Sequence, residues 1–360
     1  NLTSPTYEYN EATQSWKPKT HYPIGDLKPE RTDSWEVGLD MKLFKDFNLG
    51  LSWYLANTFN QTFDPQISVS SGYTTIYLQT GYVRNTGLEL SLGYGHTWNN
   101  NFRWDSNFTL SHNKNKIKEL VRDYVHPETG ELINKDRLDV GGLGKARFIL
   151  KEGGTLGDLY TQSDLKRDDN GMVDIDPTGI VAIENNLPDI KLGSVFPKAN
   201  LAWSNHFSWK GISLSALFTA RIGGIVYSAT EAAMDQYGVS ERSALARDNG
   251  GVLVNNRTLV DAQNYYTTIG SESGLPQYYT YNATNVRLQE ASIGYLIPRK
   301  WLGNVCDIQV SVIGRNLWMI YNKAPFDPES VATTDNYYQG IDYFMLPSTR
   351  NIGFNVKINF

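Results

Sequence analysis

The sequence predicts an all-β chain. It is expected to form about nine antiparallel strands of a larger transmembrane β-barrel, joined in part by long extracellular loops. Apolar and polar residues alternate with a period of two along much of the 360 residues. Aromatic residues make up 12% and glycines number 31, a composition typical of β proteins with much polar surface. Short and long connections also alternate strictly along the chain.

Nine segments show the alternation of a strand with one apolar and one polar face. They lie at residues 37–43, 49–55, 88–94, 102–110, 201–207, 212–222, 291–297, 308–312 and 352–360. The last segment is the clearest, because every second residue from Ile352 to Phe360 is apolar and the residues between them are Asn, Gly or Lys. Most of the segments are long enough to cross a bilayer at a tilt.

The connections between these segments predict which ends lie together. Short connections lie at residues 45–46, 97–101, 210–211 and 298–304, and long loops span residues 60–80, 113–196, 223–283 and 319–348. Strict alternation places all tight turns at one end and all long loops at the other, as in outer-membrane barrels. Residues 1–31 are predicted to form an extracellular loop leading into the barrel, and residues 32–360 to supply its strands.

Aromatic residues near the predicted strand ends favour a membrane band with two interfacial girdles. These residues are Trp35, Tyr94, Trp98, Trp203, Trp209, Tyr295 and Trp301. A soluble sheet also alternates, so core and edge positions of such a sheet are the alternative. Nine strands are an odd number, and unpaired edges in hydrocarbon are unfavourable. The chain is therefore predicted to be the C-terminal part of a larger barrel or one piece of an assembly.

Composition and motifs exclude several other classes. A net charge of −5 gives no basic excess for nucleic acid. The single cysteine, Cys306, excludes an intramolecular disulfide framework, and the five histidines are scattered. No nucleophile elbow is present, and carboxylate pairs such as Asp33 with Glu36 are better explained as solvated loop or lumen charges than as glycosidase acids. The sequence therefore predicts no enzyme.

A series of motifs recurs in a fixed order along the chain. The C-terminal third carries Arg287-Leu288, Gly294-Tyr295-Leu296-Ile297-Pro298, Arg315-Asn316-Leu317, Asp327-Pro328-Glu329, and Pro347 with Arg350. Upstream lie LKPERTDSWEVGLD at residues 27–40, VRNTGLELSLGY at 83–94, NKNKI at 113–117 and GSVFPKANLAWSN at 193–205. In order and spacing, from about residue 27 to Phe360, they resemble SusC/RagA-type TonB-dependent outer-membrane transporters.

The resemblance implies a plugged barrel in the outer membrane of a Gram-negative bacterium, energised by TonB. It implies a SusD-like surface lipoprotein over the extracellular face and the import of an oligosaccharide or, less often, a peptide. The plug domain and the TonB-contacting segment are not in this sequence. The alternative function is a soluble or surface carbohydrate-binding β protein without transport activity.

Two groups of residues are predicted to make contacts outside the barrel wall. The first group is a predicted assembly signal formed by Phe360, Ile358 and Val356. These residues end the last strand in an aromatic side chain, which the barrel-assembly machinery is expected to recognise. Loop aromatics are the candidates for cargo contact, because flat rings stack on sugar faces. They are Tyr265, Tyr266, Tyr337, Tyr338, Tyr343 and Phe344. For any one of these rings, packing within the loops or against the lipoprotein is the favoured alternative.

One loop segment partly resembles a calcium-binding loop. Asp168, Asn170 and Asp174 occupy ligand positions around Gly171. Lys166 and Pro177, however, stand where the first and last carboxylates belong. A solvated Asx-type turn is therefore favoured over a structural calcium ion, and no other cofactor is predicted.

Overall fold

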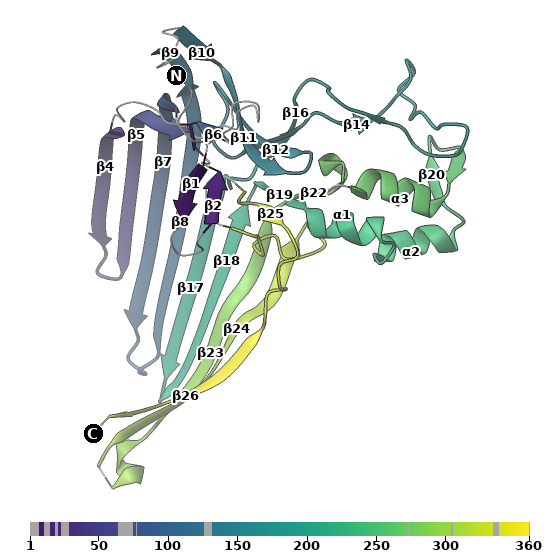
Figure 1. Ribbon diagram of the computed structural model, residues 1–360. Helices are drawn as coiled ribbons and strands as arrows, with labels where there is room; N and C mark the ends of the chain where they lie inside the picture. Colours follow the sequence, from purple (N-terminus) through teal and green to yellow (C-terminus); the bar gives the residue numbers. More distant parts are fainter. Residues whose placement is uncertain are drawn as a thin grey trace.

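The computed structural model places nine long strands in one antiparallel sheet (Figure 1). The structure describes residues 29–63, 75–76, 78–125, 132–271, 274–303, 305–333 and 338–359, together with the short strands β1 (Tyr7–Asn10), β2 (Ser15–Pro18) and β3 (His21–Tyr22). The nine strands are β4 (Arg31–Leu43), β5 (Phe47–Phe63), β7 (Leu78–Thr97), β8 (Arg103–Glu119), β17 (Ala199–Trp209), β18 (Ile212–Ile222), β23 (Asn285–Ile297), β24 (Asp307–Asn322) and β26 (Asn351–Asn359).

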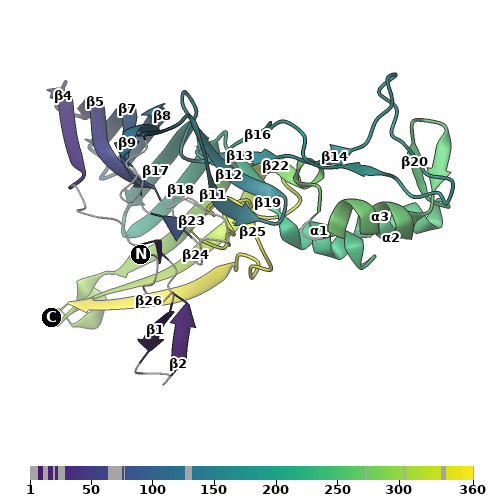
Figure 2. The same ribbon diagram turned by 45° about the horizontal axis from the view of Figure 1, so that its top comes forward.

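Their order in the sheet is their order along the chain, from β4 at one edge to β26 at the other. This is the up-and-down arrangement that the nine alternating segments predict. Figure 2 shows the sheet curved into an open trough. Because both edge strands lack an outer neighbour among the described residues, further strands are needed to close a barrel. The predicted fold class, a nine-strand portion of a larger barrel, is confirmed.

The tight turns gather at one end of the sheet, opposite the helices (Figure 1). Lys210 and Gly211 connect β17 to β18 with φ values of 48° and 87°, and Phe44 and Lys45 lie in the β4–β5 turn with φ values of 50° and 65°. Positive φ at both central residues is the type I′ geometry that matches the strand twist. Short connections between these strands therefore follow from local backbone geometry.

Several strands continue beyond the ends that the sequence predicts. β5 pairs with β7 as far as Phe63 opposite Leu78, and β8 runs to Glu119. The predicted loop boundaries at residues 60 and 113 therefore fall inside strands. The reason is that polar residues replace the outward apolar ones in these extensions, so the alternation ends although the backbone pairing continues.

The long connections fold into a cap at the other end of the sheet. Its strands are β6 (Thr75–Ile76), β9 (Val121–Val125), β10 (Leu132–Lys135), β11 (Arg137–Leu143), β12 (Ala146–Lys151), β13 (Asp158–Thr161), β14 (Asp164–Leu165), β15 (Ile183–Glu184), β16 (Ile190–Ser194), β19 (Ile225–Ser228), β20 (Val252–Val254), β21 (Thr258–Val260), β22 (Thr280–Asn282) and β25 (Ile341–Asp342). Its helices are α1 (Ala229–Gln236), α2 (Glu241–Asp248), α3 (Ala262–Gly270) and the 3-10 turn η3 (Pro276–Tyr278); a second 3-10 turn, η4 (Arg299–Leu302), lies in the β23–β24 connection. Within the described part of the chain, no helix is long and apolar enough to cross a membrane.

The main buried hydrophobic core lies in this cap and at the strand tops. Phe63, Ile117, Phe148, Leu159 and Tyr227 are all fully buried there. The apolar face of the long sheet is not covered in the same way, since Trp35 is 74% exposed and Phe354 80% exposed. The chain therefore packs its cap as a soluble protein does and leaves the apolar side of the sheet open.

An ion-pair cluster ties the cap strands together around Asp189. The Arg137 guanidinium donates to both carboxylate oxygens of Asp189, at 2.7 and 2.9 Å, and Lys151 Nζ lies 2.9 Å from Oδ2. The hydrogen bonds from Arg137 are the main cause that lowers the pKa of Asp189 to about 2. Because this pKa lies below its unfolded value, the stabilisation is present above about pH 4 and is lost as the pH falls through about 2.

Asp189→Asn is therefore expected to destabilise the cap by about 1–2 kcal/mol at pH 7, after allowance for the half-exposed cations. The difference from the unmodified protein is expected to close below about pH 2. Limited proteolysis of the cap across this pH range measures this difference in stability. Asp169→Asn, a substitution at an exposed position, serves as the matched control. A difference that persists unchanged at low pH would contradict the ion-pair explanation.

Candidate functional site

The register of the sheet aligns outward apolar side chains into rows. One row runs Leu39, Leu51, Leu90, Leu110 and Leu201 across five neighbouring strands, and the next runs Met41, Leu49, Leu92, Phe108, Trp203 and Phe218. At the other edge, Val310 opposes Val356 and Val312 opposes Phe354. An apolar surface that continues across a whole sheet exceeds what soluble monomers expose, and it matches the lipid-facing band of a membrane barrel.

The outward face holds a few polar groups, and two of them are bonded by neighbouring indoles. Asn205 and Ser106 oppose each other on β17 and β8. Trp104 Nε1 donates to Asn205 Oδ1 at 3.1 Å, and Trp203 Nε1 donates to Ser106 Oγ at 3.0 Å. Hydrocarbon supplies no hydrogen-bond partner, so polar groups in an apolar band need partners within the protein. These pairs suit a lipid-facing position.

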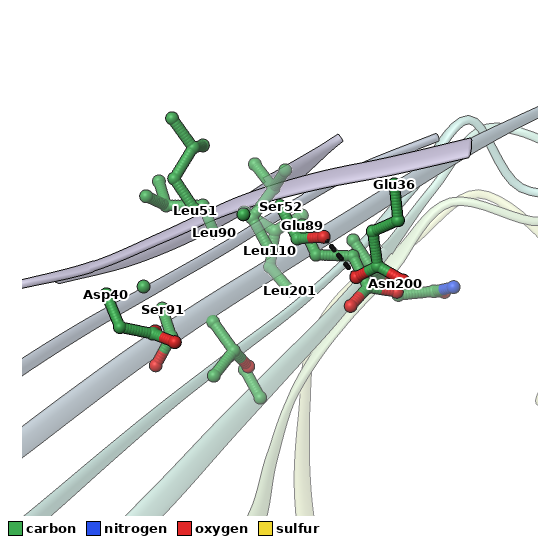
Figure 3. Close-up of a pocket in the computed structure, with 15 residues that line it drawn as sticks. Glu36, Asp40, Leu51, Ser52, Glu89, Leu90, Ser91, Leu110, Asn200 and Leu201 are labelled. Atoms are coloured by element: carbon green, nitrogen blue, oxygen red, sulfur yellow. Dashed lines mark hydrogen bonds between the residues drawn. The ribbon is translucent and has the colours of Figure 1, made fainter. Parts of the chain in front are cut away.

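The opposite, inward face is hydrophilic and concave. A hollow of about 530 Å³ lies along β4, β5, β7, β8 and β17, and Figure 3 shows its polar side chains directed to one side of the strands. They include Glu36, Asp40, Ser52, Glu89, Ser91 and Asn200. Ser52 Oγ donates to Glu36 Oε1 at 2.6 Å. Carboxylates and hydroxyls on a wide open wall can bind hydrated, hydroxyl-rich or cationic groups.

A second hollow of about 620 Å³ lies nearer the tight turns on the same face. Its wall combines both signs of charge, because Arg103 donates to Asp105 at 2.7 Å. His206 and Ser215 bond at 2.8 Å across β17 and β18 in the same wall. The inward surface is therefore polar from the cap to the turns, as the interior of a transport barrel requires.

An arginine network joins the sheet to the loop that precedes β25. Arg287 is 4% exposed, and its NH1 and NH2 donate to the two carboxylate oxygens of Asp327 at 3.1 and 2.9 Å. Its NH2 also lies 3.2 Å from Glu329 Oε2, and its Nε donates to Asn285 Oδ1. Burial alone would raise the pKa of Asp327, but the hydrogen bonds from Arg287 and a backbone amide outweigh it and hold that pKa below its usual range. Two motifs separated by about 40 residues in the sequence thus meet in space.

Comparisons with known proteins agree with this arrangement. Residues 5–134 match the family described as TonB dependent receptor-like, beta-barrel. The chain is 25% identical to TonB-dependent receptor P3 of Formosa agariphila and 24% identical to TonB-dependent receptor P26 of the same organism, over 94% and 93% of its length. In both cases it spans 35% of the relative.

Solved structures share the fold. The RagAB peptide transporter superimposes with a TM-score of 0.70 at 18% identity, over 98% of this chain and 38% of the other. The closed-closed state of the RagAB peptide importer gives a TM-score of 0.68 at 19% identity, with the same coverage. The chain therefore shares the fold of this part of the RagAB barrel, and its residues 5–134 match the TonB-dependent receptor barrel family. That family comprises receptors and transporters rather than enzymes, in agreement with the sequence prediction.

Two of the residues predicted to form an assembly signal lie on β26, an edge strand of the sheet. Val356 and Ile358 face outward on β26, 47% and 48% exposed, and oppose Val310 and Ile308. Phe360 lies outside the described residues. Recognition by the assembly machinery stays a prediction.

The candidate cargo residues Tyr265 and Tyr266 lie on α3 in the cap. Their rings pack edge to face with centroids 5.4 Å apart, and Tyr266 is 9% exposed. The neighbouring Asp235 is buried and accepts hydrogen bonds from Ser240, Arg242 and Tyr279. Tyr266 belongs to the buried core of the cap and Tyr265 packs against that core, so both tyrosines have a packing role, and cargo contact stays a prediction.

The second group of candidates lies on the connection from β24 to β26. Tyr343 and Phe344 are 51% and 61% exposed, with ring centroids 5.1 Å apart. The Phe344 amide donates to Thr230 Oγ1 at 2.7 Å, which fixes this segment beside α1. Tyr338 packs against Phe148 at 6.1 Å, and Tyr337 lies outside the described residues. Tyr343 and Phe344 therefore offer the most accessible ring faces of the described candidates.

The calcium-like segment folds into hydrogen-bonded turns. Asp168 Oδ1 accepts from the amides of Asn170 and Met172, both at 2.9 Å. Asp174 pairs with Lys166 at 2.9 Å, so the residue in the first ligand position instead neutralises a candidate ligand. No group of three or more metal-ligating side chains occurs in the part of the chain that the structure describes. The geometry favours the Asx-turn interpretation.

The sequence analysis did not single out the set of residues that builds the inward wall, although it interpreted Glu36 as a loop or lumen charge. Glu36, Asp40 and Glu89 converge there from two strands that are separated by β5. The period-two pattern contains the signal, because each of them occupies the polar side of a predicted strand. Alternation places Asp33 and Glu36 on opposite faces of β4, in agreement with the sequence analysis, which did not favour this pair as glycosidase acids.

Proposed function

We propose that this chain forms part of the wall and extracellular cap of a SusC/RagA-type transporter in the outer membrane of a Gram-negative bacterium. The observation that carries the proposal is the partition of one sheet into an apolar outward face and a polar, concave inward face. The relatives' names and the barrel family support import driven by TonB. The segments that would contact TonB are not in this sequence.

The proposed cargo is an oligosaccharide or a peptide. The inward wall supplies carboxylates, hydroxyls and amides that bind either class, and the exposed rings of Tyr343 and Phe344 suit sugar faces or apolar side chains. The similar RagAB structures are described as a peptide importer and a peptide transporter, so peptides are included among the cargoes to be tested. A SusD-like lipoprotein over the cap is the proposed partner.

The alternative, a soluble or surface carbohydrate-binding protein, leaves the apolar face of nine strands in water. At about 25 cal/mol per Å² of apolar surface, such exposure is strongly unfavourable and promotes aggregation. Among the residues that the structure describes, no element covers this apolar face. The transporter proposal therefore explains the outward face better.

Uptake by living cells tests the proposal. Cells carrying the native protein are expected to take up labelled oligosaccharide or peptide pools, and deletion of its gene or of TonB is expected to abolish the same uptake. Loss of uptake in the gene deletion but not in the TonB deletion would contradict energy coupling. Recovery of the protein in the soluble fraction would contradict the membrane location.

A further inference from the structure

A cluster of cations stands on the outward face immediately above the apolar band. The register places Trp35, Leu55, Thr86 and Lys114 in one row, and Asp33, Asn57, Arg84 and Lys116 in the next row toward the cap. Lys118 follows on the same side of β8. Lys114 therefore lies level with Trp35, a predicted girdle residue, and Lys116 lies about 7 Å farther along the strand.

These cations have few anionic partners. Lys114 and Lys118 are exposed, and none of the three lysines forms an ion pair with an acidic side chain in the described parts of the chain. Asp33, in the same row as Lys116, pairs with Arg31 at 3.0 Å, and Glu119, next to Lys118 in the sequence, lies 4.0 Å from Arg122. The register sets Arg84 directly opposite Lys116, so positive charges stand on adjacent strands.

Aromatic and polar contacts fix the position of Arg84. Its Nε donates to Asn57 Oδ1 at 2.8 Å, and its guanidinium lies 5.7 Å from the centroid of the Tyr82 ring. Phe59 stacks on Tyr82 at 4.8 Å. An ordered guanidinium beside an aromatic pair, with lysines on the neighbouring strand, forms a concentrated positive surface at one level of the barrel.

We propose that Arg84, Lys114, Lys116 and Lys118 bind the phosphate groups of membrane lipid headgroups. The inference rests on the proposed membrane location, because it uses the apolar band to define the headgroup level. Continuity with that band favours a lipid over a protein partner, since a lipid whose chains lie against the row of Trp53 and Leu88 holds its headgroup at the cation rows. Lysine stems reach such groups while their ammonium ends stay hydrated.

Lipid retention in nanodiscs tests the proposal on the native protein. Phosphatidylcholine nanodiscs are prepared with and without lipid A, whose headgroup is phosphorylated, and retained lipid A is measured by native mass spectrometry. Lys114→Gln with Lys118→Gln is expected to weaken retention about 30-fold, since each lysine near an anionic lipid surface contributes roughly fivefold. Lys135→Gln with Lys323→Gln, two exposed cap positions, removes the same charge as a control and is expected to change little.

The outcomes separate this inference from the proposed function. Failure of every variant and of the native protein to enter nanodiscs would overturn the membrane location. Normal insertion with equal lipid A retention in all proteins would overturn the headgroup site alone. Displacement of lipid A by inorganic phosphate at the same phosphate concentration would also overturn it, because it would show a site for free phosphate.

Discussion

Replacing Val356 with arginine is expected to reduce the stability of the assembled barrel by about 2–4 kcal/mol. Val356 faces outward near the middle of β26 and opposes Val310 on β24. A cation there must lie in hydrocarbon or distort the bilayer to reach water, whereas a soluble sheet would solvate it on an exposed edge strand at little cost. The effect therefore depends on the lipid environment.

The neighbouring residue provides the control. Asn355 faces inward and opposes Ser311, so Asn355→Ser is expected to change stability little. The fraction of native protein that resists unfolding by urea in lipid, read from its heat-dependent migration on a gel, measures both variants. Equal tolerance of the two substitutions would remove the membrane interpretation of this face.

Replacing Arg287 with methionine is expected to destabilise the junction between β23 and the loop that precedes β25 by about 3–5 kcal/mol. The substitution leaves the carboxylate of Asp327 buried without its bidentate partner, and it removes one contact of Glu329. Arg287→Lys is expected to recover only part of the loss, since an ammonium cannot form the paired fork. Protection of amide hydrogens in residues 324–333 from exchange measures the effect.

Arg315 supplies a matched control for this substitution. Arg315 Nε on β24 donates to Glu290 on β23 at 2.8 Å, but the Arg315 side chain is 66% exposed. Arg315→Met is expected to cost at most about 1 kcal/mol, because exposed ion pairs contribute little. Equal losses of stability from the two substitutions would contradict this explanation, because they would show that burial does not determine how much the Arg287 network stabilises the protein.

The number, order and tight turns of the nine strands could be predicted because they depend on local information. The period-two alternation of apolar and polar residues indicates each strand, and two residues such as Lys210 and Gly211 suffice to form a turn. Strand ends could not be predicted in the same way. From Asn57 to Phe63 and from Asn113 to Glu119, outward positions are mostly polar, so only pairing with a neighbouring strand reveals the continued β structure.

The secondary structure of the cap could be predicted less well from the sequence. Residues 223–283 contain three helices of eight or nine residues, each with a Ser or Asp N-cap, within a stretch predicted as loop. Short helices gain their stability from tertiary packing rather than from propensity. Likewise, the convergence of Glu36, Asp40 and Glu89, and of Arg84 with Lys116, depends on register between strands that no single segment encodes.

The central claim is that the outward face of this sheet contacts lipid, and quenching by brominated lipid tests it most directly. A fluorophore is attached to single cysteines at each position from 352 to 358 of β26, in the full-length protein with Cys306 and any cysteine outside this chain replaced by serine. Quenching is expected at Ile352, Phe354, Val356 and Ile358 and not at the three positions between them. Uniform quenching, or none at all seven positions, would contradict the barrel account.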